Sequence, residues 1–298
     1  MTAAATSVDL SRLPPPDVIE VLDFETIFAA LRADFLARFP EFTANVESDP
    51  IVKLLQVFAY RELVLRARIN DAARSVLVAY AVGADLDNIA ALFGVTRQQI
   101  EPANPITGAA AIFEDDAALR RRVLLAPDSY SVAGPASAYV FHALSADPDV
   151  LDASAISPRP GEVTVTILSR SDAAGAPSLE VLAAVRALLQ SDGIRPLTDR
   201  VTVAAAASVD FDIEAQLVLF PGPDQQLILA TANAALDQLL QSSRRLGRDI
   251  TRSAIIAALH VGGVQNVILN SPVSDVAVDL TQIANVNARA VSVAGFGS

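Results

Sequence analysis

The chain of 298 residues contains no cysteine and only two histidines. Without cysteine it can form no disulfide, no thiolate zinc site and no cysteine nucleophile. It also lacks the G-x-S-x-G, H-E-x-x-H, Walker A and G-x-G-x-x-G motifs, which weakens hydrolase, zinc-protease and nucleotide-binding interpretations. The sequence therefore offers few residues for chemistry, and we expect no catalytic site, no cofactor and no metal.

Positive charge is scarce too, because 22 Lys and Arg face 34 Asp and Glu, a formal net charge of −12. This balance repels a phosphate backbone, so we expect no nucleic-acid partner. The longest apolar run, VLVAYAVGA at 76–84, is about half the length of a membrane span, so we expect a soluble chain without membrane insertion. The start MTAAATSVDL lacks the basic and apolar regions of a signal peptide.

What the chain does have is apolar side chains, which make up 52% of its residues. The mean hydropathy of +0.40 is high for a soluble monomer. Contiguous apolar surface on a soluble protein marks contact sites, so we expect this chain to bury surface against other subunits.

Three consecutive prolines stand in the segment DLSRLPPPDVIEVLDFETIF at 9–28, crowded by apolar residues. Proline lacks a backbone donor and cannot enter a helix interior or a central strand. We therefore predict an extended arm over residues 1–23 that docks onto another surface.

Helical periodicity begins after the arm, with Asp23 as the expected N-cap and Phe39 before Pro40 as the end. Its apolar stripe consists of Phe24, Phe28, Leu31, Phe35 and Phe39. The stripe is explained either by a core within the chain or by a face shared with a partner chain.

A second helix is bracketed by Asp49 as N-cap, Pro50 at its first position and Gly83 beyond its end. It would comprise 33 residues and span about 50 Å at 1.5 Å per residue. Its apolar residues occupy more than one face, so helices from other chains would have to cover them. A brief third helix is expected in DLDNIAALFG, with Asp85 as cap and Gly94 as stop.

The remainder predicts mixed structure. Residues 98–109 carry two prolines, a glycine and no periodicity, and are predicted to be a linker. Beyond it we expect helices in DDAALRRRVLLA, from Pro135, at 178–190, from Pro223 to 241 and at 251–260, and strands in VLDASAISPRPGEVTVTILS, near Arg200, in VDFDIEAQLVLF, VQNVIL and ARAVSV.

These patterns predict an α+β chain in which a helical module precedes mixed modules with small, largely antiparallel sheets. Strand-helix-strand units recur in both halves after the linker, a loose internal echo. The expected modules are an arm at 1–23, a helical bundle at 24–97, a linker at 98–109 and α+β modules at 110–205 and 206–298.

Few residues remain as candidates for chemistry. His142 and His260 sit in predicted helices among apolar neighbours, and we interpret both as structural because no convergent partners are evident. Asp210, Asp212 and Glu214 line one strand face in the manner of some glycosidase acids, although any half-solvated strand carries this pattern.

Two charged stretches also have ordinary explanations. ADLDN at 84–88 lacks the glycine and the bidentate glutamate of a calcium loop, and helix capping explains it better. The arginines 120–122 form the basic run of the chain. We interpret them as a solvated helix face, with a salt-bridged subunit contact as the second interpretation.

Several segments resemble, in order and spacing, the baseplate assembly protein J family of contractile phage tails and tailocins. They are DLSRLPPPDVIEVLDFETIF, YAVGADLDNIAALFGVTR, SVAGPASAYVFHAL, PGEVTVTIL, IRPLTDRVTV and LGRDITRSAIIAALHVGGVQNVIL. The resemblance runs from about residue 9 to about residue 270, and the last 28 residues are less distinctive.

The resemblance implies a structural role in the baseplate of a virion or injection particle assembled in the bacterial cytoplasm. Two copies would clamp one tail protein I-like partner in a wedge, and six wedges would close around the hub and spike. The helical module would enter a mixed bundle with the partner, and the C-terminal modules would join neighbouring wedges. A sheath-initiator or lysozyme-like wedge protein is a further expected neighbour, and reorganisation of the ring would trigger sheath contraction.

The residues expected to face partners belong to the arm and the first two helices. They are Leu13, Pro14, Pro15, Pro16, Val18, Ile19, Phe24, Phe28, Leu31, Phe35, Leu55, Phe58, Leu65 and Ile69. Two alternatives remain open: a soluble enzyme acting on cell-surface glycans, motivated by the acidic strand face, and a generic oligomeric scaffold unrelated to tails.

Overall fold

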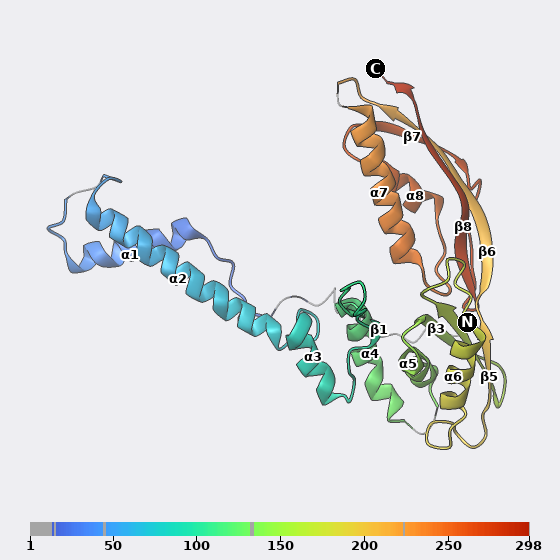
Figure 1. Ribbon diagram of the computed structural model, residues 1–298. Helices are drawn as coiled ribbons and strands as arrows, with labels where there is room; N and C mark the ends of the chain where they lie inside the picture. The colour runs from blue at the N-terminus through green and yellow to red at the C-terminus, as the bar shows by residue number, and fades with distance from the viewer. Residues whose placement is uncertain (1–13, 15, 44–45, 132–133, 223, 298) are drawn as a thin grey trace. The chain divides into compact units, whose positions relative to one another are not determined.

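The computed structural model describes residues 14, 16–43, 46–131, 134–222 and 224–297 (Figure 1). These residues divide into two compact units. The helical unit comprises the described residues of Thr6–Arg97 together with Asp115–Arg120, and the mixed unit comprises those of Gln98–Glu114 and Arg121–Ser298. The combination of helices with small sheets confirms the predicted α+β class.

The helical unit begins with α1 (Phe24–Arg38) and α2 (Pro50–Ser75), which pack against each other. The carboxylate of Asp23 accepts a bond from the Thr26 amide at 2.7 Å, and that of Asp49 accepts one from the Ile51 amide at 2.8 Å. These bonds satisfy donors that a helix start leaves free, so both predicted caps are confirmed.

The second helix is shorter than predicted, with 26 residues instead of 33. It ends at Ser75, and the backbone then turns until Gly83, where α3 (Gly83–Leu92) begins. The Arg120 guanidinium binds the carbonyl oxygens of Val78 and Ala81 in this turn, both at 2.7 Å. A side chain from far along the chain therefore stabilises the break, which local periodicity could not reveal.

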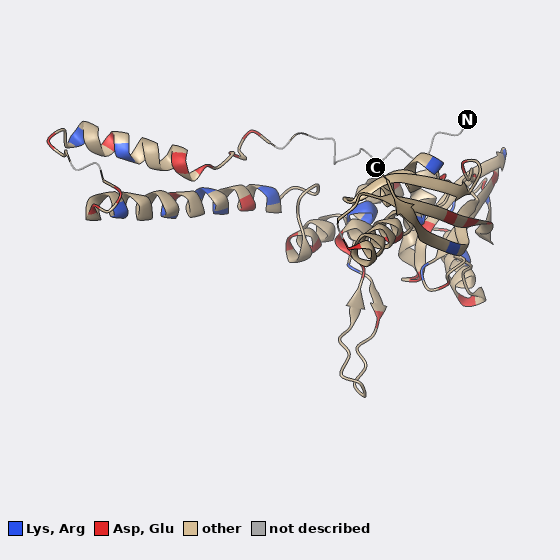
Figure 2. Ribbon diagram, turned by 90° about the horizontal axis from the view of Figure 1, so that it is seen from above, with Lys and Arg blue, Asp and Glu red and all other residues tan. Residues whose placement is uncertain are grey.

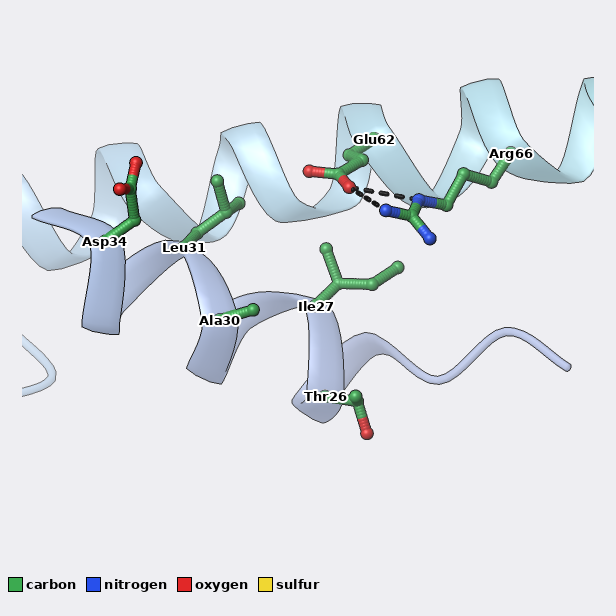
Figure 3. Close-up of a pocket in the computed structure, with 7 residues that line it drawn as sticks. All are labelled: Thr26, Ile27, Ala30, Leu31, Asp34, Glu62 and Arg66. Atoms are coloured by element: carbon green, nitrogen blue, oxygen red, sulfur yellow. Dashed lines mark hydrogen bonds and ion pairs between the residues drawn. The ribbon is translucent and has the colours of Figure 1, made fainter. Parts of the chain in front are cut away.

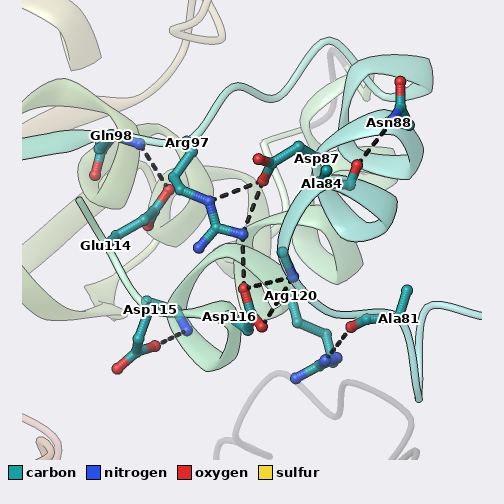
Figure 4. A network of polar contacts seen from close by, with 12 residues as sticks. Ala81, Ala84, Asp87, Asn88, Arg97, Gln98, Glu114, Asp115, Asp116 and Arg120 are labelled. Atoms are coloured by element: carbon teal, nitrogen blue, oxygen red, sulfur yellow. Dashed lines mark hydrogen bonds and ion pairs between the residues drawn. The ribbon is translucent and has the colours of Figure 1, made fainter. Parts of the chain in front are cut away.

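Asp85 was predicted to cap the third helix, but it does not. Its N-cap residue is Val82, and the Gly83 amide donates to the Asp116 carboxylate at 3.1 Å. Arg97 binds that same carboxylate at 2.6 Å and Asp87 at 2.8 Å (Figure 4), and its hydrogen bond lowers the pKa of Asp116. Gly94, with φ of +68°, ends the helix as predicted.

The segment predicted as a linker forms a β-hairpin instead. Strands β1 (Gln99–Glu101) and β2 (Ile112–Phe113) pair antiparallel, and a bridge between Asn104 and Ala109 extends the ladder toward the tip. The sequence pattern misled because the strands are very short and two prolines lie between them.

Helix α4 (Asp116–Ser129) contributes residues to both units. The mixed unit continues with α5 (Ala136–Ala146), β3 (Val150–Arg159), β4 (Glu162–Ser169), α6 (Leu179–Leu189) and β5 (Arg200–Ala205). Strands β3, β4 and β5 form one sheet. Helices α5 and α6 pack over this sheet, and Val165, Ile167 and Leu189 are fully buried between the helices and the sheet. Pro135 is the N-cap residue of α5 instead of lying in its first turn.

The second half of the mixed unit contains β6 (Ala207–Leu219), α7 (Gln225–Ser243), α8 (Arg252–Leu259), β7 (Val264–Ser271) and β8 (Gln282–Phe296). Alternation along β6 is confirmed, since Ile213, Ala215, Leu217 and Leu219 are buried beneath α7 and α8. The N-cap residue of α7 is Asp224, and Pro223 lies outside the described residues.

Both three-stranded sheets are mixed, not largely antiparallel. Their strand orders are β3-β4-β5 and β7-β6-β8. In each sheet the central strand runs antiparallel to one neighbour and parallel to the other. The two sheets therefore repeat the same pattern of strand pairing, as the predicted internal similarity suggested. The order of the strands along the chain differs, because the central strand is the second strand of the first sheet and the first strand of the second sheet.

Close contacts tie the two sheets of the mixed unit together. Strands β5 and β6 are separated by Ala206 alone. The buried Asp152 carboxylate accepts a bond from the Leu246 amide at 2.9 Å. Leu168 and Ile283 pack with Leu246 in a small core at the junction. These contacts join segments about a hundred positions apart into one body.

The arginines 120–122 were interpreted as a solvated helix face, and the structure shows that this interpretation is wrong. Arg120 caps the turn after α2, and Arg121 pairs with Asp152 at 2.6 Å. Arg122 and Glu114 form a buried ion pair, in which the Arg122 side chain is 8% exposed and the Glu114 side chain 2%. All three guanidiniums are therefore bound within the chain, because buried charge requires a partner.

Candidate interaction surface

The two histidines do not form a site. His142 lies half-buried in α5 with its ring against Phe141, and burial lowers the pKa of His142. His260 is the exposed C-cap residue of α8. Among the described residues, no group of three or more His, Cys, Asp or Glu is placed to hold a metal ion.

The acidic face of β6 is bound by neighbouring side chains. Hydrogen bonds from Ser208 and from Asn285 at 2.9 Å lower the pKa of Asp210. Asn287 donates to Asp212 at 3.2 Å. A general acid needs a raised pKa, so this arrangement favours a solvated strand face over a glycosidase site.

A pH dependence is expected from His142. Because burial lowers its pKa in the folded state, the unfolded chain binds the proton more readily. Stability should therefore fall as the pH drops below about 6.5, the pKa of unperturbed histidine. We expect His142→Gln to flatten the free energy of unfolding between pH 7 and 5, measured by urea titration. His260→Gln is the control, and an equal effect of both variants would contradict this origin.

Helices α1 and α2 bury little of their apolar surface. Only Ile27 of α1 and Val52, Ala59 and Asn70 of α2 are buried among the described residues of these two helices. Six large apolar or aromatic side chains on α2 are each more than half exposed. They are Leu54, Val57, Phe58, Tyr60, Leu65 and Ile69.

One exposed stripe on α2 has the spacing of a helix-packing seam. We define the α2 apolar face as Ile51, Leu54, Phe58, Leu65 and Ile69, which are separated by three, four, seven and four residues. Ile51, Phe58 and Ile69 each directly precede a buried residue of α2, namely Val52, Ala59 and Asn70. The face is thus turned by about 100° from the buried side, where a further helix would pack.

The end of the arm is held by α2 of the same chain. Asn70 accepts a bond from the Glu20 amide at 3.0 Å and donates to the Glu20 carbonyl oxygen at 2.8 Å. Arg66 binds the Glu20 carboxylate at 2.9 Å. Nevertheless Val21 is 99% exposed and Val18 54%, so the anchored arm still presents apolar side chains to solvent.

Asn70→Ala should release the backbone of Glu20, because it removes the two hydrogen bonds that the Asn70 side chain makes to that backbone. We expect the protection of the Glu20 amide from hydrogen exchange to fall by roughly tenfold, the effect of about 1.4 kcal/mol. Asn88→Ala is the control, because Asn88 bonds within α3 to the Ala84 carbonyl oxygen. An unchanged Glu20 amide would show that other contacts hold the arm.

The groove between α1 and α2 is a shallow hollow of about 370 Å³ (Figure 3). Apolar Ile27, Ala30 and Leu31 line it on α1, and a Glu62–Arg66 ion pair at 2.7 Å borders it on α2. The outer side of α1 has a second hollow that includes Phe28 and Leu36. Incomplete packing of this kind is expected where further helices complete a core.

The predicted interface residues fall into three groups. Leu13 and Pro15 lie outside the described residues. Pro14, Val18, Phe58, Leu65 and Ile69 are exposed, and Pro16, Ile19, Phe24, Phe28, Leu31, Phe35 and Leu55 are half-buried. The predicted set does not include Ile51 and Leu54, which are exposed on the same side of α2 as Phe58.

No helix in the described part of the chain is long and apolar enough to cross a membrane. Comparison with known proteins then points to one family. The family model of the baseplate J-like N-terminal domain matches residues 47–104, and that of the baseplate J-like central domain matches residues 131–205. The model of the baseplate J-like protein C-terminal domain matches residues 211–293. Baseplate protein J of Escherichia phage P2 is 45% identical over 284 residues, which cover 92% of this chain and 94% of that protein. This chain is a member of the baseplate J-like family.

Proposed function

We propose that the chain is a wedge subunit of a contractile tail or related injection particle, and that it assembles through its helical unit. Family membership makes it a structural baseplate protein. The observation that carries the finer proposal is the α2 apolar face, a long stripe of exposed apolar residues at helix-packing spacing. A stripe of this kind becomes stable when partner helices cover it.

The proposed partner is a tail protein I-like subunit that contributes these helices, clamped by two copies of this chain. Six such wedges would close into a ring around the hub and spike, beside a sheath-initiator or lysozyme-like wedge protein. Assembly would take place in the host cytoplasm, and reorganisation of the ring would trigger sheath contraction. The extended arm, anchored at Glu20 and exposed at Val18 and Val21, would join the same contact.

Co-expression with the neighbouring tail protein, followed by mass determination of the complex, tests this proposal. We expect a stable complex with two copies of this chain for each partner. A chain that stays monomeric and ignores the neighbour would overturn it. Genes for sheath, tube and spike beside this one would argue against the alternative of a generic scaffold.

The alternative of a glycan-acting enzyme depended on Asp210, Asp212 and Glu214. Serine and asparagine side chains bind the first two carboxylates, and Asn270 donates to Glu214 at 3.4 Å. This pairing favours the structural role. An activity on a glycan panel that is lost when these three residues are replaced would reverse the preference.

A further inference from the structure

The hairpin of β1 and β2 has a firmly held base. The Glu114 amide donates to the Gln98 carbonyl oxygen at 2.9 Å, and the Glu114 carboxylate accepts from the Gln98 amide at 3.0 Å (Figure 4). The same carboxylate forms the buried ion pair with Arg122. The Gln98 side chain also donates to the Leu144 carbonyl oxygen at 3.1 Å. The hairpin therefore starts from a fixed point in the mixed unit.

Beyond its base the hairpin contributes nothing to a core. Every residue from 101 to 110 is exposed, and the two strands project as a ribbon (Figure 2). A two-stranded ribbon is marginally stable in water unless it packs on something. Folding of the mixed unit therefore gives no reason for this projection, which points to a contact with another molecule.

The tip is closed by hydrogen bonds and carries an apolar side chain. The Asn104 side chain accepts bonds from the amides of Ile106 and Thr107, at 2.9 and 3.2 Å. The Asn104 carbonyl oxygen accepts from the Gly108 amide at 2.9 Å, and Gly108 has the left-handed φ of +73° that favours glycine. Ile106, at the end of this closed turn, is 93% exposed. A preorganised turn thus holds an isoleucine in water.

The hairpin is almost uncharged in a strongly acidic protein. Residues 98–113 contain one charged side chain, that of Glu101, while the chain carries −12. Two copies repel each other through their net charge, and an uncharged projection is the part of the surface that approaches a second copy at least electrostatic cost. This favours self-contact over binding to a basic partner, which the acidic surface would attract.

We propose that the hairpin of residues 98–114 is an assembly arm that places Ile106 in contact with a second copy of this chain. Exposed apolar residues held rigidly act as anchors because little conformational entropy is lost when they bind. The contact belongs to the mixed unit and does not use the α2 apolar face.

Cross-linking in the Leu65→Asp background tests the arm separately from the proposed helical contact. The chain has no cysteine, so Ile106→Cys carries its single thiol, which takes a benzophenone label. We expect photolysis to yield a covalent dimer of this chain, identified by mass spectrometry. Leu197→Cys is the matched control, because Leu197 is also 93% exposed in the mixed unit. A dimer yield no higher than that of the control would overturn the proposal.

Sedimentation equilibrium supplies the second measurement. In the same background, Ile106→Asp should weaken self-association by at least about 30-fold, the effect of losing an interface hot spot, whereas Leu197→Asp should leave it unchanged. A chain that is monomeric at all concentrations before Ile106 is changed would overturn the proposal. So would an arm that, in the assembled complex, cross-links only to a different protein.

Discussion

The double variant Phe58→Asp/Leu65→Asp should lose binding to the helical partner by at least about 100-fold while the chain remains folded. The two side chains are 54% and 65% exposed, so replacing them removes little of the chain's own core. In the proposed complex they would lie under partner helices, where an unpaired buried carboxylate is costly. Titration calorimetry with the co-purified tail protein measures the affinity, and thermal unfolding checks the fold.

A leucine outside the helical unit provides the control for this variant. Leu179, at the start of α6, is 84% exposed. Leu179→Asp adds one negative charge to the mixed unit, half of what the double variant adds, and should leave the affinity within about twofold, because additional surface charge alone changes little. Equal losses in both variants would mean that net charge, and not the α2 apolar face, governs binding.

Glu114→Ala should destabilise the mixed unit by about 3–5 kcal/mol, because it leaves the Arg122 guanidinium buried without its carboxylate. The pair is among the least exposed charged groups described, with side chains 2% and 8% exposed. The change also removes the bond from the Gln98 amide, so the base of the hairpin should loosen. Urea unfolding measures the free energy, and hydrogen exchange at Gln98 reports the base.

An exposed ion pair serves as the reference for this loss. Arg38 and Asp34 bond at 3.1 Å on α1 with side chains 77% and 62% exposed. Asp34→Ala should cost far less than Glu114→Ala, since water screens such exposed pairs. If the two variants cost the same, burial of the Glu114–Arg122 pair would not explain its contribution.

Elements whose signals lie close together in the sequence were predicted well. Asp23 and Asp49 bond to amides three and two positions away, so the helix starts are written locally. Alternation along β6 marked its buried face because successive side chains point to opposite sides of a sheet. The collinear motifs similarly predicted the baseplate J-like family.

The exposure of several residues on α2 agrees with the predicted interaction surface, which stays a prediction. Phe58, Leu65 and Ile69 follow helical spacing and are exposed, as an interface requires. The anchoring of Glu20 by Asn70 was missed because the two residues are 50 positions apart and an asparagine within a helix has no distinctive pattern.

The sequence by itself determined where most helices and strands begin, which strand face is buried and which family the chain belongs to. Each of these depends on neighbouring residues or on motif order. Tertiary structure alone decided the end of α2, the partners of the three arginines, the mixed pairing of both sheets and the hairpin at 98–114. These features depend on contacts between distant segments, such as Arg120 with Val78 and Asp152 with Leu246, whose energies appear only when folding brings the groups together.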